Sequence, residues 1–334
     1  MAQPDPRVSV VIPTRNRREL LLRTLTSVLA QENVDIAVVV VDEASSDGTG
    51  DALTSLAEPR VSVVRHATPL GVAAARNAGL EHVDTDWVAF VDDDDVWAPD
   101  KLASQLEALG ARPECEWSCT GAVVVDGALS IVGVEAVPAD VRLVERLLAY
   151  NAIPGGGSSV LARTDAVRAV GGFDPGLRVV ADWDLWIRLA LRSPLASVDR
   201  PLVGYLRHAG SMSRELEEIR HELEHVAQKH AAARSERGLA FPWERWLLWA
   251  AAMHRRAGRH LDPAGIYARL AWQRRQPLLL AKAALAAVWP GWIDVRDRLA
   301  AQEVPEEWIA EAERWLMPLR TASPPVTDPA EALA

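Results

Sequence analysis

The sequence is poor in cysteine, with only Cys115 and Cys119 in 334 residues. Neither their number nor their spacing is typical of a disulfide framework or a zinc cluster, so two buried thiols are expected. Basic residues are also outnumbered, with 36 Lys and Arg against 46 Asp and Glu and a net charge of −10. This balance argues against a general nucleic-acid-binding protein.

Long apolar segments are scarce too. The first seven residues contain no apolar signal segment, so we expect a cytoplasmic location. The apolar stretch 277–289 is short and contains Lys282, which does not favour a transmembrane helix. The glycines at 155–157 are not followed by the Gly-Lys-Ser/Thr of a phosphate-binding loop, so ATP hydrolysis is not indicated.

Composition divides the chain in two. The tail from Ser213 is electrically neutral, so residues 1–212 carry the whole net charge, while eight of the 13 tryptophans lie in the tail. The tail is helical by composition and has no strand patterns. We therefore predict an α/β domain over 1–212 and a helical C-terminal region over 213–334.

Within the first hundred residues, apolar runs alternate with segments of helical periodicity. Strands without polar alternation, separated by helices, are typical of a mostly parallel sheet covered on both faces. The predicted strands are 8–12, 36–41, 61–65 and 87–91, and the predicted helices are 17–30, 51–58, 72–82 and 99–109.

Polar side chains follow three of these strands. They are Thr14 and Arg15, then Asp42, then the four aspartates Asp92 to Asp95. Ligands of such sheets bind beyond the carboxyl ends of the strands, so these groups should meet in one crevice. Four adjacent carboxylates repel one another. They predict either a divalent cation with a phosphorylated ligand or a solvated acidic turn.

Six motifs follow one another along roughly residues 7–213. They are Val8-Ser-Val-Val-Ile-Pro-Thr-Arg-Asn-Arg17, Val40-Val-Asp-Glu-Ala-Ser-Ser-Asp-Gly-Thr49, Gly71-Val-Ala-Ala-Ala-Arg-Asn-Ala-Gly79, Phe90-Val-Asp-Asp-Asp-Asp-Val-Trp97, Asp182-Trp-Asp-Leu-Trp-Ile-Arg-Leu189 preceded by Gly171-Gly-Phe-Asp-Pro175, and Tyr205-Leu-Arg-His-Ala-Gly-Ser-Met-Ser213. Together they resemble family 2 glycosyltransferases of the GT-A fold, with the motif at 90–97 similar to the DxD motif of that family. This resemblance implies a nucleotide-sugar-dependent, inverting enzyme.

For the sugar-diphosphate side, the resemblance implies that Asp94 is a ligand of Mn or Mg and that Asp92 contacts the ribose or the metal. Asp93 departs from the usual small residue and would share the ribose contact, and Asp95 would orient the loop. Related enzymes have a histidine near the place of His208 in this chain, and that histidine touches the metal or the diphosphate. His208 is thus either a metal ligand or a surface residue.

For the nucleotide, the resemblance implies that Asp42 accepts a hydrogen bond from the base, with a UDP-linked donor favoured. Thr14 and Arg15 would flank the base or ribose. Arg76 would approach the phosphates or instead form an ion pair with an aspartate of the cluster. The family commonly has an aspartate where this chain has Glu43.

For the chemistry, the resemblance implies that Asp182 is the general base that deprotonates the acceptor hydroxyl. Ala181 replaces the family's glutamate, and Asp184 is the alternative base. Trp183 and Trp186 either floor the sugar or acceptor site or pack in the core. The alternative from another class is a non-catalytic nucleotide-sugar-binding or scaffold protein.

Two features of the tail invite other interpretations. His221 to His225 formally match the HExxH zinc pattern, which we interpret as an exposed helix face because its charged surroundings are unlike a protease core. The basic, tryptophan-bearing stretch 245–289 suggests packing on the acidic domain, a homodimer interface or contact with the inner face of a membrane. The acceptor, whether glycan, lipid-linked, peptide or small molecule, stays open.

Overall fold

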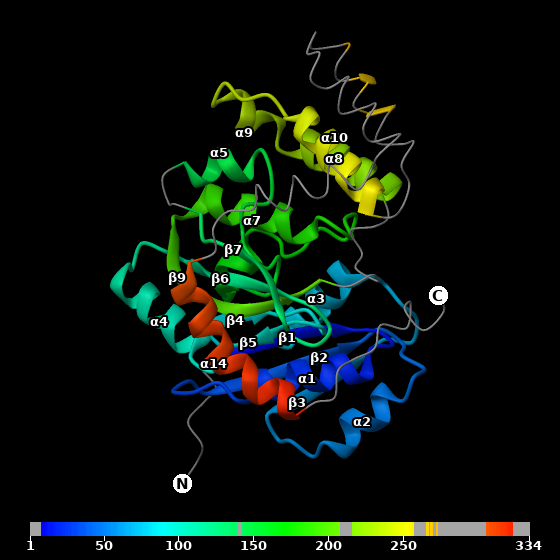
Figure 1. Cartoon of the computed structure of the whole chain (residues 1–334), viewed down its shortest axis with the longest axis vertical. Coiled ribbons are helices and arrows are strands. Elements are labelled where there is room, and N and C mark those ends of the chain that lie inside the picture. The colour runs from blue at the N-terminus through cyan, green and yellow to red at the C-terminus, as the bar shows by residue number, and fades with distance from the viewer. Residues whose placement is uncertain are drawn as a thin grey trace. The chain divides into compact units, whose positions relative to one another are not determined.

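The computed structural model describes residues 8–138, 142–207, 216–256, 265, 266, 268, 269, 272 and 305–322 (Figure 1). The chain forms two compact units, residues 1–210 with 304–334, and residues 211–303. The first unit contains a nine-stranded mixed sheet with strand order β3-β2-β1-β4-β8-β6-β9-β5, and β7 pairs with β6. The predicted α/β fold is confirmed.

The N-terminal half of the sheet is parallel. In this half β1 lies between β2 and β4, and β3 pairs with β2 at the edge. The elements of this half are β1 (Val8–Thr14), α1 (Arg18–Leu29), β2 (Ile36–Asp42), α2 (Thr49–Ser55), β3 (Val61–Arg65), α3 (Val72–Glu81) and β4 (Trp87–Phe90). Every side chain of β1 is buried, as the run of apolar residues predicts for a strand covered on both faces.

The second half mixes orientations, because β8 runs antiparallel to both β4 and β6, whereas β9 runs parallel to β6. Its elements are β5 (Val96–Trp97), α4 (Lys101–Ala111), β6 (Trp117–Val125), β7 (Ile131–Glu135), α5 (Leu143–Leu147), β8 (Val160–Arg163), α6 (Thr164–Ala169), α7 (Ala181–Arg192) and β9 (Leu195–Leu206).

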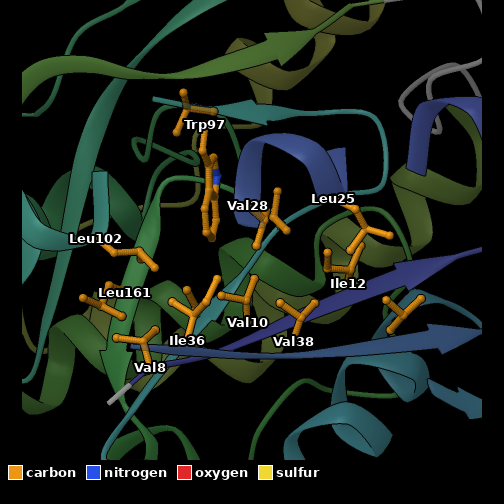
Figure 2. Packing of buried hydrophobic residues seen from close by; sticks show 14 of the residues in the cluster. Val8, Val10, Ile12, Leu25, Val28, Ile36, Val38, Trp97, Leu102 and Leu161 are labelled. Atoms are coloured by element: carbon orange, nitrogen blue, oxygen red, sulfur yellow. The ribbon is translucent and has the colours of Figure 1, made fainter. Parts of the chain in front are cut away.

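The main core lies between α1 and the sheet. Figure 2 shows side chains of β1 and β2, such as Val10 and Val38, facing Leu25 and Val28 of α1, with Trp97 at the same level. All five of these side chains are almost fully buried. Cys115 and Cys119 are buried free thiols, as predicted. This core fixes the end of β1 and the start of α1, where the candidate site begins.

The last described helix, α14 (Glu306–Ala322), belongs to the first unit, which differs from the predicted division at residue 213. Its Leu316 and Leu319 join an apolar cluster with Leu206 of β9, and the Trp315 indole donates to the carbonyl of Pro201 at 3.2 Å. Composition predicts a helix here, but not that its apolar side covers β9.

The second unit contains α8 (Leu216–Lys229), α9 (Ala231–Ser235) and α10 (Trp243–Arg256). The HExxH sequence lies on α8, where the His221 side chain is 77% exposed. In the described part of the chain, no three His, Cys, Asp or Glu side chains form a group able to hold a metal ion. None of the described helices is long and apolar enough to span a membrane. His208 and most of the stretch 245–289 lie outside the described residues.

Helix α3 lies close against the sheet because residue 79 is a glycine. A β-carbon placed on Gly79 would lie 2.3 Å from Cγ1 of Val11 and 3.2 Å from Cγ2 of Val41, in β1 and β2. The close approach brings Arg76, one turn earlier on α3, toward the end of β4. Both the packing of α3 on the sheet and the position of Arg76 therefore depend on the absence of a side chain at Gly79.

Gly79→Ala is expected to lower the free energy of unfolding by about 1–3 kcal/mol, because the added methyl group overpacks the helix–sheet contact. Helix propensity by itself would favour alanine over glycine by about 1 kcal/mol. Gly110 of α4 has nothing within 4 Å of its would-be β-carbon, so Gly110→Ala serves as the matched control and should stabilise. Urea unfolding followed by circular dichroism measures both, and equal midpoints would contradict the packing argument.

Candidate active site

The carboxyl ends of the parallel strands bring the predicted polar groups together. Thr14 stands beside Asp42 in the β1–β2 register, and Asp42 stands beside Arg65 in the β2–β3 register. The Thr14 hydroxyl donates to Oδ2 of Asp93 at 2.7 Å, which ties the end of β1 to the loop after β4. Arg15, from the same loop as Thr14, is exposed.

Asp42 is completely buried, and one of its two carboxylate oxygens accepts no hydrogen bond. Its Oδ1 accepts a hydrogen bond from the Ser45 N–H at 2.9 Å. Its Oδ2 accepts no hydrogen bond and lies 3.4 Å from Nε of Arg65, whose side chain is 59% exposed. A buried carboxylate oxygen without a hydrogen-bond donor is costly to maintain, and the charge of Arg65 offsets part of that cost.

Glu43, the departure from the family pattern, points elsewhere. Its carboxylate accepts hydrogen bonds from the backbone N–H groups of Leu70 (2.8 Å) and Gly71 (2.6 Å) and contacts Nδ1 of His66. Because Gly71 immediately precedes α3, Glu43 fixes the loop between β3 and α3. Its role in this structure is to hold the loop.

The four aspartates after β4 turn to four different sets of partners. Asp92 pairs with Arg76, and Asp93 binds Thr14 and Arg17. Asp94 binds Nη1 of Arg17 at 2.9 Å. Asp95 accepts hydrogen bonds from the Ser158 hydroxyl and from the Leu206 N–H, the latter at 2.8 Å. The Asp92 and Asp94 side chains retain solvent exposure of 27% and 13%, whereas Asp93 and Asp95 are buried.

Burial governs the charge states in this loop. Burial raises the pKa of Asp93 to about 6, against the opposing pull of the Arg17 guanidinium. Burial, reinforced by the neighbouring Asp94 and Asp92, raises the pKa of Asp95 well above its ordinary value. Asp93 and Asp95 are therefore buried supports of the loop, whereas Asp92 and Asp94 keep partial solvent exposure in their ion pairs with Arg76 and Arg17. The ribose contact of Asp93 stays a prediction, and in this structure its carboxylate binds Thr14 and Arg17.

The sequence left two arrangements open for Arg76, a phosphate contact or an ion pair with an aspartate. In this structure Arg76 forms the ion pair. Its buried guanidinium pairs with Asp92 and stacks over the ring of Phe173 at 5.1 Å. Its Nε has no hydrogen-bond partner. The next residue, Asn77, exchanges two hydrogen bonds of 2.8 Å with the backbone of Phe173. These contacts lock the Gly-Gly-Phe-Asp turn to α3.

Asp182 lies in the first turn of α7 and faces the glycine-rich loop. Its Oδ1 accepts from the Trp183 N–H at 2.7 Å, and its Oδ2 accepts from the Asn151 amide at 3.2 Å. Gly156 has a φ of +54°, and a β-carbon on it would lie 3.3 Å from Oδ2 of Asp182. Burial raises the pKa of Asp182, while the charge of Arg76 opposes the rise.

The glycine-rich loop joins the acidic loop to Asp182. A β-carbon on Gly157 would lie 3.1 Å from Nη2 of Arg76, and the Ser158 hydroxyl accepts from the Asp92 N–H at 3.1 Å. The Trp97 indole donates to the carbonyl of Ser158 at 2.9 Å. Because Gly156 and Gly157 have no side chains, the loop packs closely against both Asp182 and the Arg76–Asp92 pair.

Asp184, the alternative base, is fully buried, and its Oδ2 accepts hydrogen bonds from Nη2 and Nε of Arg188 in the same helix at 2.7 and 3.0 Å. Trp183 donates to the carbonyl of Leu147 at 2.6 Å, and Trp186 stacks on Trp117 with ring centroids 6.0 Å apart. Both tryptophans are almost completely buried, so core packing is the correct one of their two interpretations.

Sequence reasoning missed the roles of Arg17 and Ser158. Arg17 is the last residue of the quoted motif 8–17, but nothing in the local sequence shows that its side chain reaches the acidic loop. Ser158 directly follows the glycines at 155–157, and nothing in the local sequence shows that its hydroxyl binds Asp95. Asp95 lies 63 residues from Ser158 and 111 from Leu206, so these contacts depend on the sheet topology.

Comparisons with known proteins agree with the fold described above. TarS residues 1–349 from S. aureus, in complex with UDP-GlcNAc, superposes with a TM-score of 0.55 at 16% identity, covering 85% of this chain and 89% of that one. The mannosyltransferase PcManGT of Pyrobaculum calidifontis, in complex with GDP-Man and Mn²⁺, gives a TM-score of 0.50 at 21% identity over 95% of this chain and 83% of that one. The domain has the GT-A glycosyltransferase fold.

Residues 9–126 match the family model described as Glycosyl transferase family 2. The putative teichuronic acid biosynthesis glycosyltransferase TuaG of Bacillus subtilis is 41% identical over 118 residues. That match covers 35% of this chain and 46% of TuaG, so this chain matches less than half of that relative's length. Over residues 9–126 the chain is thus similar to family 2 glycosyltransferases.

Proposed function

We propose that the chain is an inverting glycosyltransferase that transfers a sugar from a nucleoside-diphosphate sugar to an acceptor hydroxyl. The observation that carries the proposal is the position of Arg76 between the two halves of the site. Its guanidinium pairs with Asp92 of the acidic loop, lies against Gly157, and acts electrostatically on Asp182. A donor held at Asp92 and Asp94 and a hydroxyl held at Asp182 thus share one site.

Asp182 is suited to the general-base role. In the transfer, its carboxylate accepts the hydroxyl proton while the hydroxyl oxygen bonds to the anomeric carbon and the bond from that carbon to the diphosphate oxygen breaks. Attack opposite the leaving group inverts the anomeric centre. Burial raises the pKa of Asp182, which makes it a stronger base than an exposed aspartate.

Asp92 and Asp94 fit a divalent cation that shares its coordination with the donor. The described side chains form no group of three metal ligands, whereas two partly exposed carboxylates are present. Mg²⁺ is commonly held by one or two carboxylates together with substrate phosphates, and Mn²⁺ accepts the same oxygen ligands. When bound there, such a cation would stabilise the charge of the departing diphosphate.

Asp42 favours a uridine donor. Its Oδ2, which accepts no hydrogen bond from the protein, matches the single N3–H of uracil once Arg65 turns away, and the exposed Arg65 can then donate to a neighbouring carbonyl. Guanine presents two adjacent donors, and only one oxygen is free to receive them. TarS binds UDP-GlcNAc whereas PcManGT binds GDP-Man, so the choice of uridine rests on Asp42; the name of TuaG suggests a glycan acceptor.

Asp42→Asn tests the nucleotide assignment. The amide has one oxygen for two donors, the Ser45 N–H and the base N–H, so UDP affinity should fall by about 10- to 100-fold, as expected for a lost charged hydrogen bond. Isothermal titration with UDP and with GDP measures the change, and the loss should be larger for UDP. Asp51→Asn removes the same charge from the exposed start of α2 and should leave UDP affinity unchanged. Equal UDP affinity in Asp42→Asn and wild type would refute the assignment.

A further inference from the structure

Three arginines surround the four aspartates, and they differ in how firmly they are held. Arg23 and Arg76 are 3% and 4% exposed, and each has guanidinium nitrogens without hydrogen-bond partners. Arg17 retains 28% exposure of its side chain. It is therefore the arginine of the three that can leave its position without exposing a core.

The position of Arg17 is that of a cation between carboxylates. A single nitrogen, Nη1, lies 3.0 Å from Oδ1 of Asp93 and 2.9 Å from Oδ2 of Asp94. The backbone of Arg17 is fixed, because its carbonyl accepts the Leu21 N–H at the start of α1. The charged end thus reaches the acidic loop on a flexible stem from a rigid base, and it binds one of the two carboxylates that the proposed function assigns to a metal.

We propose that Arg17 is a tethered cation that occupies Asp94 in the donor-free protein, is displaced from it when a divalent cation binds, and then pairs with the donor's diphosphate. The inference rests on the proposed function for the identity of the anion. Two cations cannot share one carboxylate oxygen at close range without repulsion, so metal and guanidinium compete for Asp94. Once displaced, the guanidinium is suited to bidentate pairing with phosphate oxygens.

Arg17→Gln in the full chain tests whether Arg17 competes with a metal ion for Asp94 or only supports the structure of the acidic loop. Without nucleotide, the variant should bind Mn²⁺ at least about fivefold more tightly than wild type, since removing a unit charge a few ångströms away is worth about 1 kcal/mol or more even in a watery environment. With saturating Mn²⁺, its UDP affinity should fall by about fivefold or more, since the phosphates lose a partner. Mn²⁺ titration followed by electron paramagnetic resonance measures the first affinity, and calorimetry measures the second.

Arg18→Gln is the matched control. It removes the same charge one residue along, from a side chain that is 46% exposed and pairs with Glu19. It should change neither affinity by more than about twofold. Arg17→Lys keeps the charge without the planar fork and should lie between wild type and Arg17→Gln, which provides a second test if the glutamine variant does not fold.

The opposite signs are the decisive result. A purely structural role for Arg17 would weaken both affinities, and that outcome would overturn the proposal. Unchanged or weaker Mn²⁺ binding in Arg17→Gln, or no Mn²⁺ binding to either protein, would overturn it too. Because the Mn²⁺ measurement uses no nucleotide and no turnover, a failure of sugar transfer in the wild type would contradict the proposed function separately.

Discussion

Asp182→Asn is expected to lower the turnover number for sugar transfer by about 10²- to 10⁴-fold while UDP affinity stays within about twofold of wild type. The loss follows because general-base catalysis contributes rate enhancements of that order and an amide cannot accept the hydroxyl proton. The residue contacts Asn151 and the Trp183 N–H, whereas the nucleotide contacts we assign lie on other loops. Steady-state transfer assays and UDP calorimetry measure the two quantities.

Asp184→Asn is the control two residues along the same helix. Asp184 is buried against Arg188, so its loss should lower the melting temperature more than the turnover number of the folded enzyme. Equal transfer by wild type and Asp182→Asn would exclude the assigned base and favour the alternative of a protein that binds nucleotide-sugar without turnover.

The pH profile gives a second check on Asp182. Only the ionised carboxylate is a base, and burial raises its pKa, so turnover should fall on acidification at a higher pH than for an ordinary aspartate, whose pKa is about 3.9. The Asn151 amide favours the ionised form. Asn151→Ala should therefore move the acid limb to still higher pH, and an unmoved limb would contradict this account.

The location of the candidate site could be predicted from the sequence because parallel strands have a simple rule. Apolar runs marked β1, β2 and β4, and the polar residues after each run had to meet at one edge of the sheet. The structure places Thr14, Asp42 and Asp93 together there. Only the order of elements and the strand periodicity were needed for this step.

The division of labour among the four aspartates could not be predicted, because it depends on which way each side chain turns. Asp93 and Asp94 are adjacent in sequence and equally acidic, yet Asp93 turns to the buried hydroxyl of Thr14 and Asp94 stays accessible. Asp95 is fixed by Leu206 at the end of β9, a strand that sequence periodicity did not reveal. Contacts between residues this distant require the sheet order first.

The helix α14 shows the same limit at the level of a whole element. An amphipathic helix can cover any complementary apolar surface, and nothing in the sequence of α14 indicates that it packs on β9. The helix nevertheless covers Leu206 and the neighbouring strand ends through Leu316 and Leu319. Its apolar stripe therefore helps to fix the strand whose last residue supports Asp95.

Asp94→Ala is expected to remove the dependence of UDP affinity on Mn²⁺. In the wild type, Mn²⁺ should strengthen UDP binding because the cation joins a protein carboxylate to the phosphates, and in the variant this enhancement should fall by at least about tenfold, in line with the 1.5–3 kcal/mol of a charge-assisted contact. Calorimetry with UDP in the presence and absence of Mn²⁺ measures it. Asp84→Ala, on the exposed turn before β4, removes an equal charge and should leave the enhancement intact.

Asp92→Ala distinguishes the two accessible carboxylates from each other. Asp92 is the ion-pair partner of the buried Arg76, so its removal deprives that buried charge of its direct partner and should lower the free energy of unfolding by about 3–5 kcal/mol. Asp94 pairs with the more exposed Arg17, and Asp94→Ala should cost far less stability. If Asp94→Ala destabilised the protein as much as Asp92→Ala while leaving the Mn²⁺ enhancement unchanged, the assignment of Asp94 to the metal would be wrong, and Asp94 would be a support of the loop like Asp95.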